Sequence, residues 1–251
     1  MKENSKVRVF KSDFWESLTH VHPIMPLVVW VPVILFWLWR SYNVYQLSAL
    51  EFLVLAGVGL LVWTLTEYLL HRFMFHFRAT GQIGRRFVFM FHGLHHDEPE
   101  CATRLVMPPV PAVLIVTVLY NLFSLVVPNQ YMLAFMAFFM SGYLCYDYIH
   151  YATHHFAMTS KVGRFLRSYH LKHHFSHEAS KFGVSNPLWD YVFRTVEGPP
   201  LPHESSHRSP HDDQNSTRVR HARQRVLDRS PRRFQQRIFP SGRARLRRFG
   251  R

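Results

Sequence analysis

The longest charge-free stretch of the sequence runs from residue 105 to residue 146. It contains no Asp, Glu, Lys or Arg over 42 residues, and Pro128-Asn129-Gln130 interrupts it with a turn signal. A helix needs ~20 apolar residues to cross a bilayer, so this stretch predicts two transmembrane helices joined as a hairpin. The alternative is a pair of helices buried in the core of a soluble protein.

Two earlier apolar runs predict a second hairpin. Residues 24–39 carry no charge over 16 residues, and residues 47–70 are apolar except near their ends. The first run is short and contains Pro26 and Pro32, so a re-entrant segment is the alternative there. The fold class that we expect is all-α: an integral membrane protein with four transmembrane helices capped by a helical, His-rich domain.

Basic residues are distributed unequally between the two sides of this arrangement. With four crossings, the N-terminus, residues 71–104 and everything after residue 147 lie on one side. That side carries fifteen Lys and Arg before residue 200, whereas the opposite side carries Arg40 alone. The positive-inside rule therefore places the first side in the cytosol. We expect the endoplasmic reticulum for a eukaryotic protein and the inner membrane for a bacterial one.

The formal net charge of +14 comes mostly from the end of the chain. Residues 201–251 hold 14 Arg and 4 acidic residues, whereas residues 1–200 hold 16 Lys and Arg against 12 acidic residues. Because the excess lies in a tail of low apolar content, we expect a disordered tail and no nucleic-acid partner. The predicted organisation is a cytosolic segment at residues 1–23, a membrane-embedded body at residues 24–199 and the tail at residues 200–251.

Ten of the 18 histidines fall into four boxes of defined spacing. Positions i, i+3 and i+4 share a helix face, so the two HxxHH boxes and the HxxxH box can each aim their imidazoles in one direction. His71 and His76 are five residues apart, about 140° around an ideal helix, and would reach one site only at a helix end or from two sides of a metal cluster. The ten residues are His71, His76, His92, His95, His96, His150, His154, His170, His173 and His174.

All four boxes lie on the predicted cytosolic side, next to the points where the spans leave the membrane. One HxxHH box alone would indicate no more than a surface patch or a single zinc site. Ten imidazoles in this order suit two metal ions with about five nitrogen ligands each. The sequence therefore predicts a dinuclear metal centre at the membrane surface.

The number of histidines favours iron in this centre. Imidazole suits Fe, Cu, Zn and Ni, but zinc has no redox chemistry and a catalytic zinc normally takes three protein ligands. Two iron ions, with O2 as co-substrate, could oxidise a C–H bond. Zinc binds such sites more tightly than ferrous iron and can replace it in purified protein.

Two carboxylates and a phenol lie beside the boxes. Glu67 is four residues before His71, and Asp147 is three residues before His150, each on the same helix face. An acid that borders a long apolar stretch is costly unless it is paired, so we predict that Asp147 and its neighbour Tyr146 are catalytic-site residues that orient ligands or substrate. The alternative for Asp147 is a helix-end position facing water. The remaining histidines, including His155 and His177, are expected to be solvated.

Several segments resemble the fatty acid 2-hydroxylase family, part of the larger fatty acid hydroxylase/sterol desaturase superfamily. The likeness covers about residues 14–197. It is carried by WTLTEYLLHRFMFH (63–76), HGLHH (92–96), TRLVMPPVPA (103–112), GYLCYDYIHYATHH (142–155) and FGVSNPLWDYVF (182–193). The histidine boxes are common to the superfamily, whereas the PPVPA, GYLCYD and FGVS…LWDYVF segments are more specific to 2-hydroxylases.

The resemblance implies a fold, an activity and partners. It implies a four-helix transmembrane bundle under a cytosolic dimetal cap, which adds a hydroxyl to C2 of long-chain acyl groups, free or in sphingolipid precursors. Family members use O2 and electrons from cytochrome b5. The ten box histidines match the family's metal ligands, and Tyr146 and Asp147 match positions close to the metals. The chain has no room for the cytochrome b5 domain of many eukaryotic relatives, so we expect a separate cytochrome b5-type or other reductase as donor.

Other functions remain as alternatives to this interpretation. The nearest is another lipid oxidation of the superfamily, such as sterol methyl oxidation, desaturation or carotenoid hydroxylation. A haem electron-transfer protein would need histidines facing each other within the membrane, and a metal transporter would need polar ligands within its spans. Residues 105–146 contain almost none, which favours the lipid hydroxylase.

Overall fold

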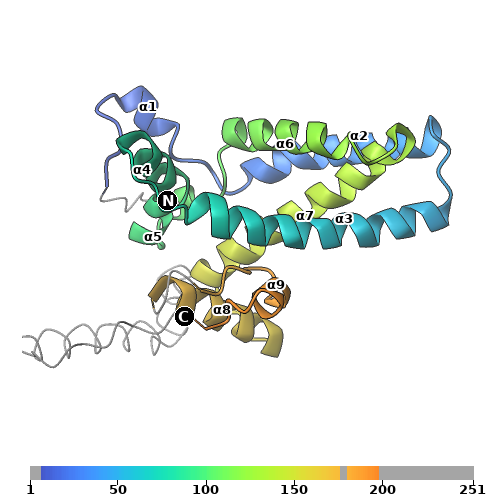
Figure 1. Cartoon of the computed structure of the whole chain (residues 1–251). Helices are drawn as coiled ribbons and strands as arrows, with labels where there is room; N and C mark the ends of the chain where they lie inside the picture. The colour runs from blue at the N-terminus through green and yellow to red at the C-terminus, as the bar shows by residue number, and fades with distance from the viewer. Residues whose placement is uncertain (1–6, 176–179, 198–251) are drawn as a thin grey trace, which may run out of the picture. The chain divides into compact units, whose positions relative to one another are not determined.

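A computed structural model describes residues 7–175 and 180–197, within which every regular element is a helix and there is no strand (Figure 1). The long helices are α2 (Met25–Asn43), α3 (Ala49–Leu69), α6 (Pro109–Phe123) and α7 (Asn129–His155). The shorter ones are α1 (Asp13–Ser17), α4 (Gln82–Val88), α5 (Leu94–Asp97), α8 (Lys161–Phe175) and α9 (Leu188–Val192). Two π-helical segments, Leu70–Phe75 and Phe89–Gly93, and a 3₁₀ turn, Ala102–Arg104, complete the set.

Four segments of the described chain are long and apolar enough to cross a membrane. They are Met25–Asn43, Ala49–Phe75, Ala102–Phe123 and Asn129–His155. At 1.5 Å per residue the shortest of them measures roughly 28 Å, close to the thickness of a bilayer core. The four expected spans and the all-α fold class are therefore confirmed. The tail at residues 200–251 lies outside the described residues, and its disorder stays a prediction.

The starts of these helices follow from local sequence. Pro26 lies in the first turn of α2, where its missing N–H costs nothing, and α2 continues through Pro32 as one helix rather than a broken segment. Ser48 and Glu51 form a capping box at the start of α3. Pro128 immediately precedes α7, so the expected turn between the third and fourth spans is present.

Helix α7 is the centre of the bundle. It packs against α2 and α3, and Phe135, Phe139 and Met140 are among its fully buried side chains. A glycine lets α3 and α7 approach closely, because a Cβ at Gly142 would lie 2.6 Å from Cγ of Trp63. This contact sets the position of α3 along α7. One histidine box directly follows the C-terminal end of α3, and another lies at the C-terminal end of α7.

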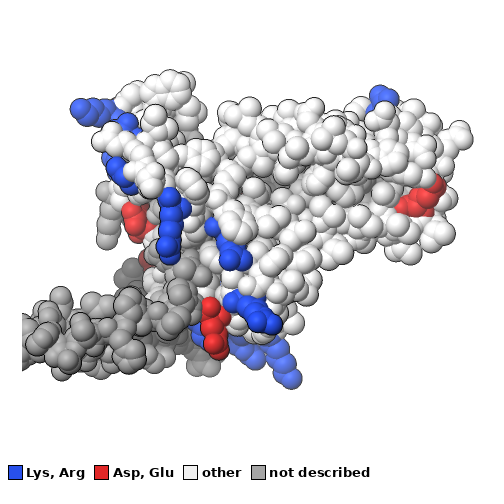
Figure 2. Space-filling view, in the orientation of Figure 1, with Lys and Arg blue, Asp and Glu red and all other residues white. Residues whose placement is uncertain are grey.

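The outward faces of the bundle are apolar and uncharged. Leu53 on α3 is 70% exposed and Val110 on α6 is 73% exposed. Figure 2 shows a white band over the long helices, with Lys and Arg gathered at the end that carries α1, α4 and α8. Soluble proteins seldom expose apolar surface on this scale, so the bundle is suited to lipid rather than to water.

One basic residue has a different role from the one that its sequence suggests. Arg104 counts among the residues of the predicted cytosolic side, yet its side chain is only 1% exposed. It pairs with Glu16 at 2.6 Å and with Glu98 at 2.8 Å, and it donates to the carbonyl of Val7. The buried Arg104 thereby ties the N-terminal segment to the turn that follows α5.

Candidate metal centre

The π-helical segments change the direction of the histidine boxes. His76 N–H donates to the carbonyl of His71 over 3.2 Å, a bond that closes a five-residue π turn rather than a four-residue α turn. The rings of His71 and His76 consequently lie with centroids 5.0 Å apart. The five-residue spacing, which an ideal α-helix would spread around its circumference, serves one site at the end of α3.

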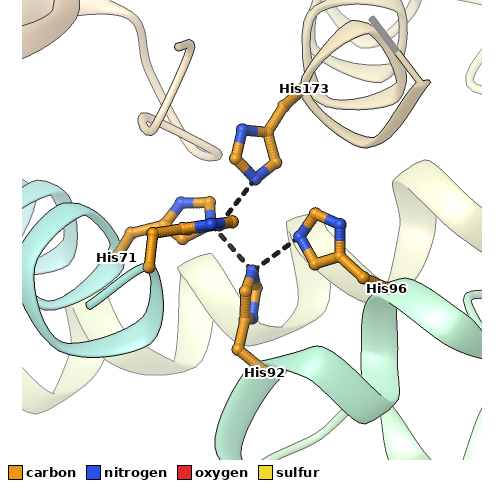
Figure 3. Close-up of side chains that lie close together, drawn as sticks. His71, His92, His96 and His173 are labelled. Carbon is orange, nitrogen blue, oxygen red and sulfur yellow. Dashed lines mark hydrogen bonds between the residues drawn. The ribbon is translucent and has the colours of Figure 1, made fainter. Parts of the chain in front are cut away.

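Five imidazoles meet in what we name the first group. Its members are His71, His76, His92, His96 and His173, and their candidate ligand atoms all lie within 4.8 Å of one another. The Nε2 atom of His92 is 3.0 Å from Nε2 of His71 and 3.0 Å from Nε2 of His96 (Figure 3). These side chains come from the end of α3, from the segment around α5 and from α8.

Backbone carbonyls fix two of these rings. Nδ1–H of His71 donates to the carbonyl of Phe182, and Nδ1–H of His173 donates to the carbonyl of Ser180 over 2.7 Å. A proton on Nδ1 leaves the Nε2 lone pair bare, which is the form that binds a metal. Bare lone pairs that face other imidazole nitrogens at about 3 Å fit a shared cation.

The remaining five imidazoles make the second group. Its members are His95, His150, His154, His170 and His174, again with ligand atoms within 4.8 Å of one another. Nε2 of His95 is 2.9 Å from Nε2 of His174 and 3.0 Å from Nε2 of His150. Four of the five project from α7 and α8 as i, i+4 pairs, so regular helices set their direction.

Each HxxHH box is divided between the two groups. His92 and His96 join the first group, whereas His95 joins the second. The rings of His96 and His174 then stack across the boundary with centroids 4.1 Å apart. The structure thus brings together all ten box histidines in two sets of five, but one box does not serve one site.

Burial keeps the imidazoles of the cap neutral. It lowers the pKa of His76 to about 3 and that of His96 to about 2, with the neighbouring His173 adding to both effects. Burial likewise lowers the pKa of His173 to about 4 and holds the pKa values of His95 and His170 well below the ordinary 6.5. Neutral imidazoles at physiological pH are ready to coordinate metal without losing a proton.

The two acids beside the boxes, Glu67 and Asp147, bind groups other than the box imidazoles in the described part of the chain. Within the described residues, Glu67 bonds to no imidazole; its carboxylate accepts from the amides of Val184 and Ser185 at 2.7 and 2.8 Å. Asp147 accepts from the hydroxyl of Tyr143 at 3.3 Å. Tyr146 stacks on His150 with centroids 5.8 Å apart, so its ring does border the second group.

One acid escaped the sequence analysis. Asp190 is fully buried and accepts from the amides of Phe182 at 2.9 Å and Gly183 at 2.8 Å. In the sequence it stands out only as a member of the LWDYVF segment, which carries the family resemblance. The spacing of eight residues between Asp190 and Phe182 carries no helical or strand signal that could have revealed the contact.

The described histidines outside the boxes, His20, His22 and His155, lie outside both groups. His20 binds the Thr103 hydroxyl through Nδ1 at 2.7 Å, and Nδ1 of His22 accepts from the amide of Ile24. His155 follows His154 directly, yet its ring lies against Tyr151 with centroids 4.5 Å apart. His177 and the four tail histidines lie outside the described residues.

An apolar cavity adjoins both groups. It lies between α3, α6 and α7 and is partly open to the outside. Trp63, Leu119 and Phe139 line its membrane portion, and Phe75 and Tyr146 line the end near the histidines. Phe75 stacks on His92 with centroids 5.3 Å apart, while Tyr146 stacks on His150. The cavity wall therefore includes one ring that stacks on a histidine of each group.

Comparison with known proteins identifies the family to which the chain belongs. Residues 56–195 match the family model described as fatty acid hydroxylase. The chain is 35% identical over 189 residues to a dihydroceramide fatty acyl 2-hydroxylase of Arabidopsis thaliana, an alignment that covers 75% of this chain and 79% of that protein. The chain belongs to the fatty acid hydroxylase family.

Other relatives of this fatty acid hydroxylase agree. Human fatty acid 2-hydroxylase is 35% identical over 218 residues, which cover 78% of this chain and 58% of the human protein. A solved structure of full-length scs7p, in which only the hydroxylase domain is visible, matches with a TM-score of 0.70 and 36% identity, over 77% of this chain and 73% of that one. The expected family is confirmed, and with it a hydroxylase enzyme for lipid in a membrane setting.

Proposed function

We propose that this fatty acid hydroxylase places a hydroxyl group on C2 of long-chain acyl groups, free or in sphingolipid precursors. The observation that carries the proposal is the pair of five-histidine groups beside an apolar cavity. The names of the relatives, which include dihydroceramide fatty acyl and fatty acid 2-hydroxylases, support the choice of substrate and position.

The cavity suits an acyl chain that enters tail first. Its walls in the membrane portion are apolar, so an acyl tail can pass from the bilayer into the cavity without a desolvation cost. The eight residues from Trp63 to His71 correspond to about 12 Å along α3. A tail alongside Trp63 leaves the carboxyl or amide end near the histidines, where C2 is the next carbon.

Tyr143 and Tyr146 belong to the wall of the cavity, and the Tyr143 hydroxyl is bound to Asp147. We assign to the Tyr146 hydroxyl the task of donating to the acyl carbonyl oxygen, which would orient the C2 hydrogens toward the metals. Asp147 accepts from Tyr143 and would hold that neighbouring ring in place.

We assign two iron ions to the ten box histidines, one ion to each group. When bound, the iron pair would supply the activation of O2 that hydroxylation of a C–H bond requires, a role for which redox-inactive zinc is unsuited. The imidazoles hold the ions through Nε2, the carbonyl-bound rings keep their tautomer, and the surrounding apolar walls exclude water.

We further propose that the histidine face lies in the cytosol. Fifteen Lys and Arg before residue 200 belong to that side and Arg40 alone to the other, which is the bias that the positive-inside rule describes. Electrons would come from a separate cytochrome b5-type or other reductase. The endoplasmic reticulum or a bacterial inner membrane, with residues 1–23 as cytosolic segment and 24–199 as body, completes the proposal.

A matched pair of variants tests the reaction. The chain, expressed with a competent reductase and supplied with long-chain fatty acid or ceramide, should yield 2-hydroxy acyl products by mass spectrometry. His154→Ala should abolish them, whereas His155→Ala, which changes the next residue outside both groups, should retain them. Absence of 2-hydroxy products from the unaltered, metal-loaded protein, or hydroxylation at another carbon, would contradict the proposal.

A further inference from the structure

A short loop next to the first group binds two of its imidazole rings. Residues 180–185, here called the carbonyl loop, present the carbonyls of Ser180 and Phe182 to Nδ1–H of His173 and His71. These two histidines come from different helices, 102 residues apart in sequence. The position of the loop therefore decides whether two of the five Nε2 atoms of the first group point at a common centre.

The carbonyl loop is held by two buried carboxylates. Asp190 accepts from the amides of Phe182 and Gly183, and Glu67 accepts from the amides of Val184 and Ser185. Glu67 also accepts from the Ser185 hydroxyl. Four consecutive backbone amides thus bind carboxylate oxygens, and both acids are almost inaccessible, at 3% exposure for Glu67 and 0% for Asp190.

The remaining contacts of the loop leave it little freedom. The hydroxyl of Thr195 donates to Asp190 at 2.7 Å, and the amide of Lys181 donates to the carbonyl of Thr195. At Gly183 the backbone passes so close to its neighbours that a Cβ would lie 2.0 Å from the carbonyl oxygen of Asn186. Charge-assisted bonds of this kind are stronger than neutral ones, so the loop is a rigid support.

Three rings of the second group lack such support within the described residues. Nδ1 of His95, His170 and His174 is buried, and none of the three has a hydrogen-bond partner within the described part of the chain. The carboxylate-held loop consequently acts on one group and not on the other.

We propose that Glu67 and Asp190 are positioning residues, which hold the carbonyl loop and thereby set the metal affinity of the first group alone. The proposal rests on the metal binding proposed above, but not on the reaction. A hydrogen bond to the ring nitrogen that does not bind the metal fixes the tautomer and orientation of a ligating histidine. Loss of such a bond typically weakens metal binding by roughly 10–100-fold. The same loss at Glu67 or Asp190 should leave the second group unaffected.

Metal release from the purified full-length protein tests the proposal. The protein is loaded with Fe²⁺, and transfer of the metal to a chelator is followed in time. His173→Ala and His174→Ala, adjacent residues of opposite groups, assign the release phases, because each variant should remove one phase. Asp190→Asn and Glu67→Gln replace an acceptor oxygen by an NH₂ group that faces backbone N–H, so release from the first group should accelerate about 10–100-fold.

The controls separate positioning from general destabilisation. Glu197→Gln, which changes an exposed acid in the same C-terminal segment, should leave both phases unchanged. If Asp190→Asn accelerates both phases equally, or neither, the proposal is wrong. Should either variant fail to fold, Ser185→Ala, which removes only one bond to Glu67, must still accelerate the first phase alone.

The outcomes also distinguish this proposal from the proposed function. An unaltered protein that binds two ions, shows the selective acceleration and makes no 2-hydroxy product would support the positioning role and refute the reaction. An unaltered, folded protein that binds no metal would refute both.

Discussion

The two histidine groups reach similar geometry by different means. The second group takes four of its five rings from i, i+4 pairs on α7 and α8, so two regular helices orient them. The first group draws its rings from the end of α3, from the region of α5 and from α8, and it needs the carbonyl loop to align His71 and His173. Irregular segments can place histidine ligands in directions that a regular helix does not allow. Their rings then need hydrogen bonds from another part of the chain to keep their orientation.

Acid tests the property that both groups share, which is burial of neutral imidazoles. In the metal-free protein the pKa values of His76, His96 and His173 are about 3, 2 and 4, below the ordinary 6.5. The unfolded chain therefore takes up protons that the folded chain does not, and stability should fall as pH drops from about 6.5 toward 4.

The size of this pH effect is the largest that we predict. Each such imidazole can lower the free energy of unfolding by at most about 1.4 kcal/mol per pH unit. Thermal unfolding of the metal-free protein in detergent should show a midpoint that declines steadily through this interval. A midpoint that does not change with pH would mean that the imidazoles are solvated, which would contradict the burial of both groups.

A glycine pair sharpens the comparison. Gly183→Ala should force the carbonyl loop to shift, because the new methyl group would overlap backbone, at a cost of about 1–3 kcal/mol in stability. Metal should be lost from the first group while the second retains its ion. Gly57→Ala is the control, since nothing lies within 4 Å of a Cβ there. Equal metal contents in the two variants would show that the loop does not support the first group.

Tyr146 offers a test on the side of the second group. Tyr146→Phe keeps the ring that stacks on His150 but removes the hydroxyl, so metal content should be unchanged. Loss of one hydrogen bond to the acyl head, about 1.4 kcal/mol, should lower kcat/KM for hydroxylation roughly tenfold. Tyr148→Phe, whose hydroxyl donates to Pro23, is the control. Comparable activities for both variants would remove Tyr146 from the site.

The smallest effect concerns the Ser185 hydroxyl, which donates to Glu67 and accepts from the side-chain amide of Asn186 at 3.2 Å. Ser185→Ala removes the hydroxyl that donates to Glu67 and leaves both amide bonds in place. A loss of about 1 kcal/mol corresponds to roughly fivefold faster metal release from the first group only. Ser168→Ala, an exposed position on α8, provides the baseline. Acceleration of the second group's phase by Ser185→Ala would contradict the separation of the two groups.

Much of this molecule could be predicted because its strongest signals are local. The long charge-free stretches predicted the spans, and the density of histidines predicted two sets of five. The assignment of individual rings could not be predicted, since the π turns at Leu70–Phe75 and Phe89–Gly93 alter the helical phase on which face arguments depend.

Contacts between distant residues account for the rest. Glu67 shares a helix face with His71 in the sequence, but its partners Val184 and Ser185 lie more than a hundred residues further along the chain. Arg104 is one of the basic residues of the predicted cytosolic side, yet its side chain is buried and paired with Glu16 and Glu98. Neither a buried ion pair nor the carboxylates that hold the carbonyl loop produce a periodic pattern in the sequence.

Metal stoichiometry tests the central claim, that ten imidazoles form two separate sites, most directly. Purified protein is saturated with Fe²⁺, freed of excess metal and analysed for ions per chain, together with His173→Ala and His174→Ala. The account predicts two ions in the unaltered protein and one in each variant, with the remaining ion in the opposite group. Two ions retained in both variants, or none in the unaltered protein, would contradict it.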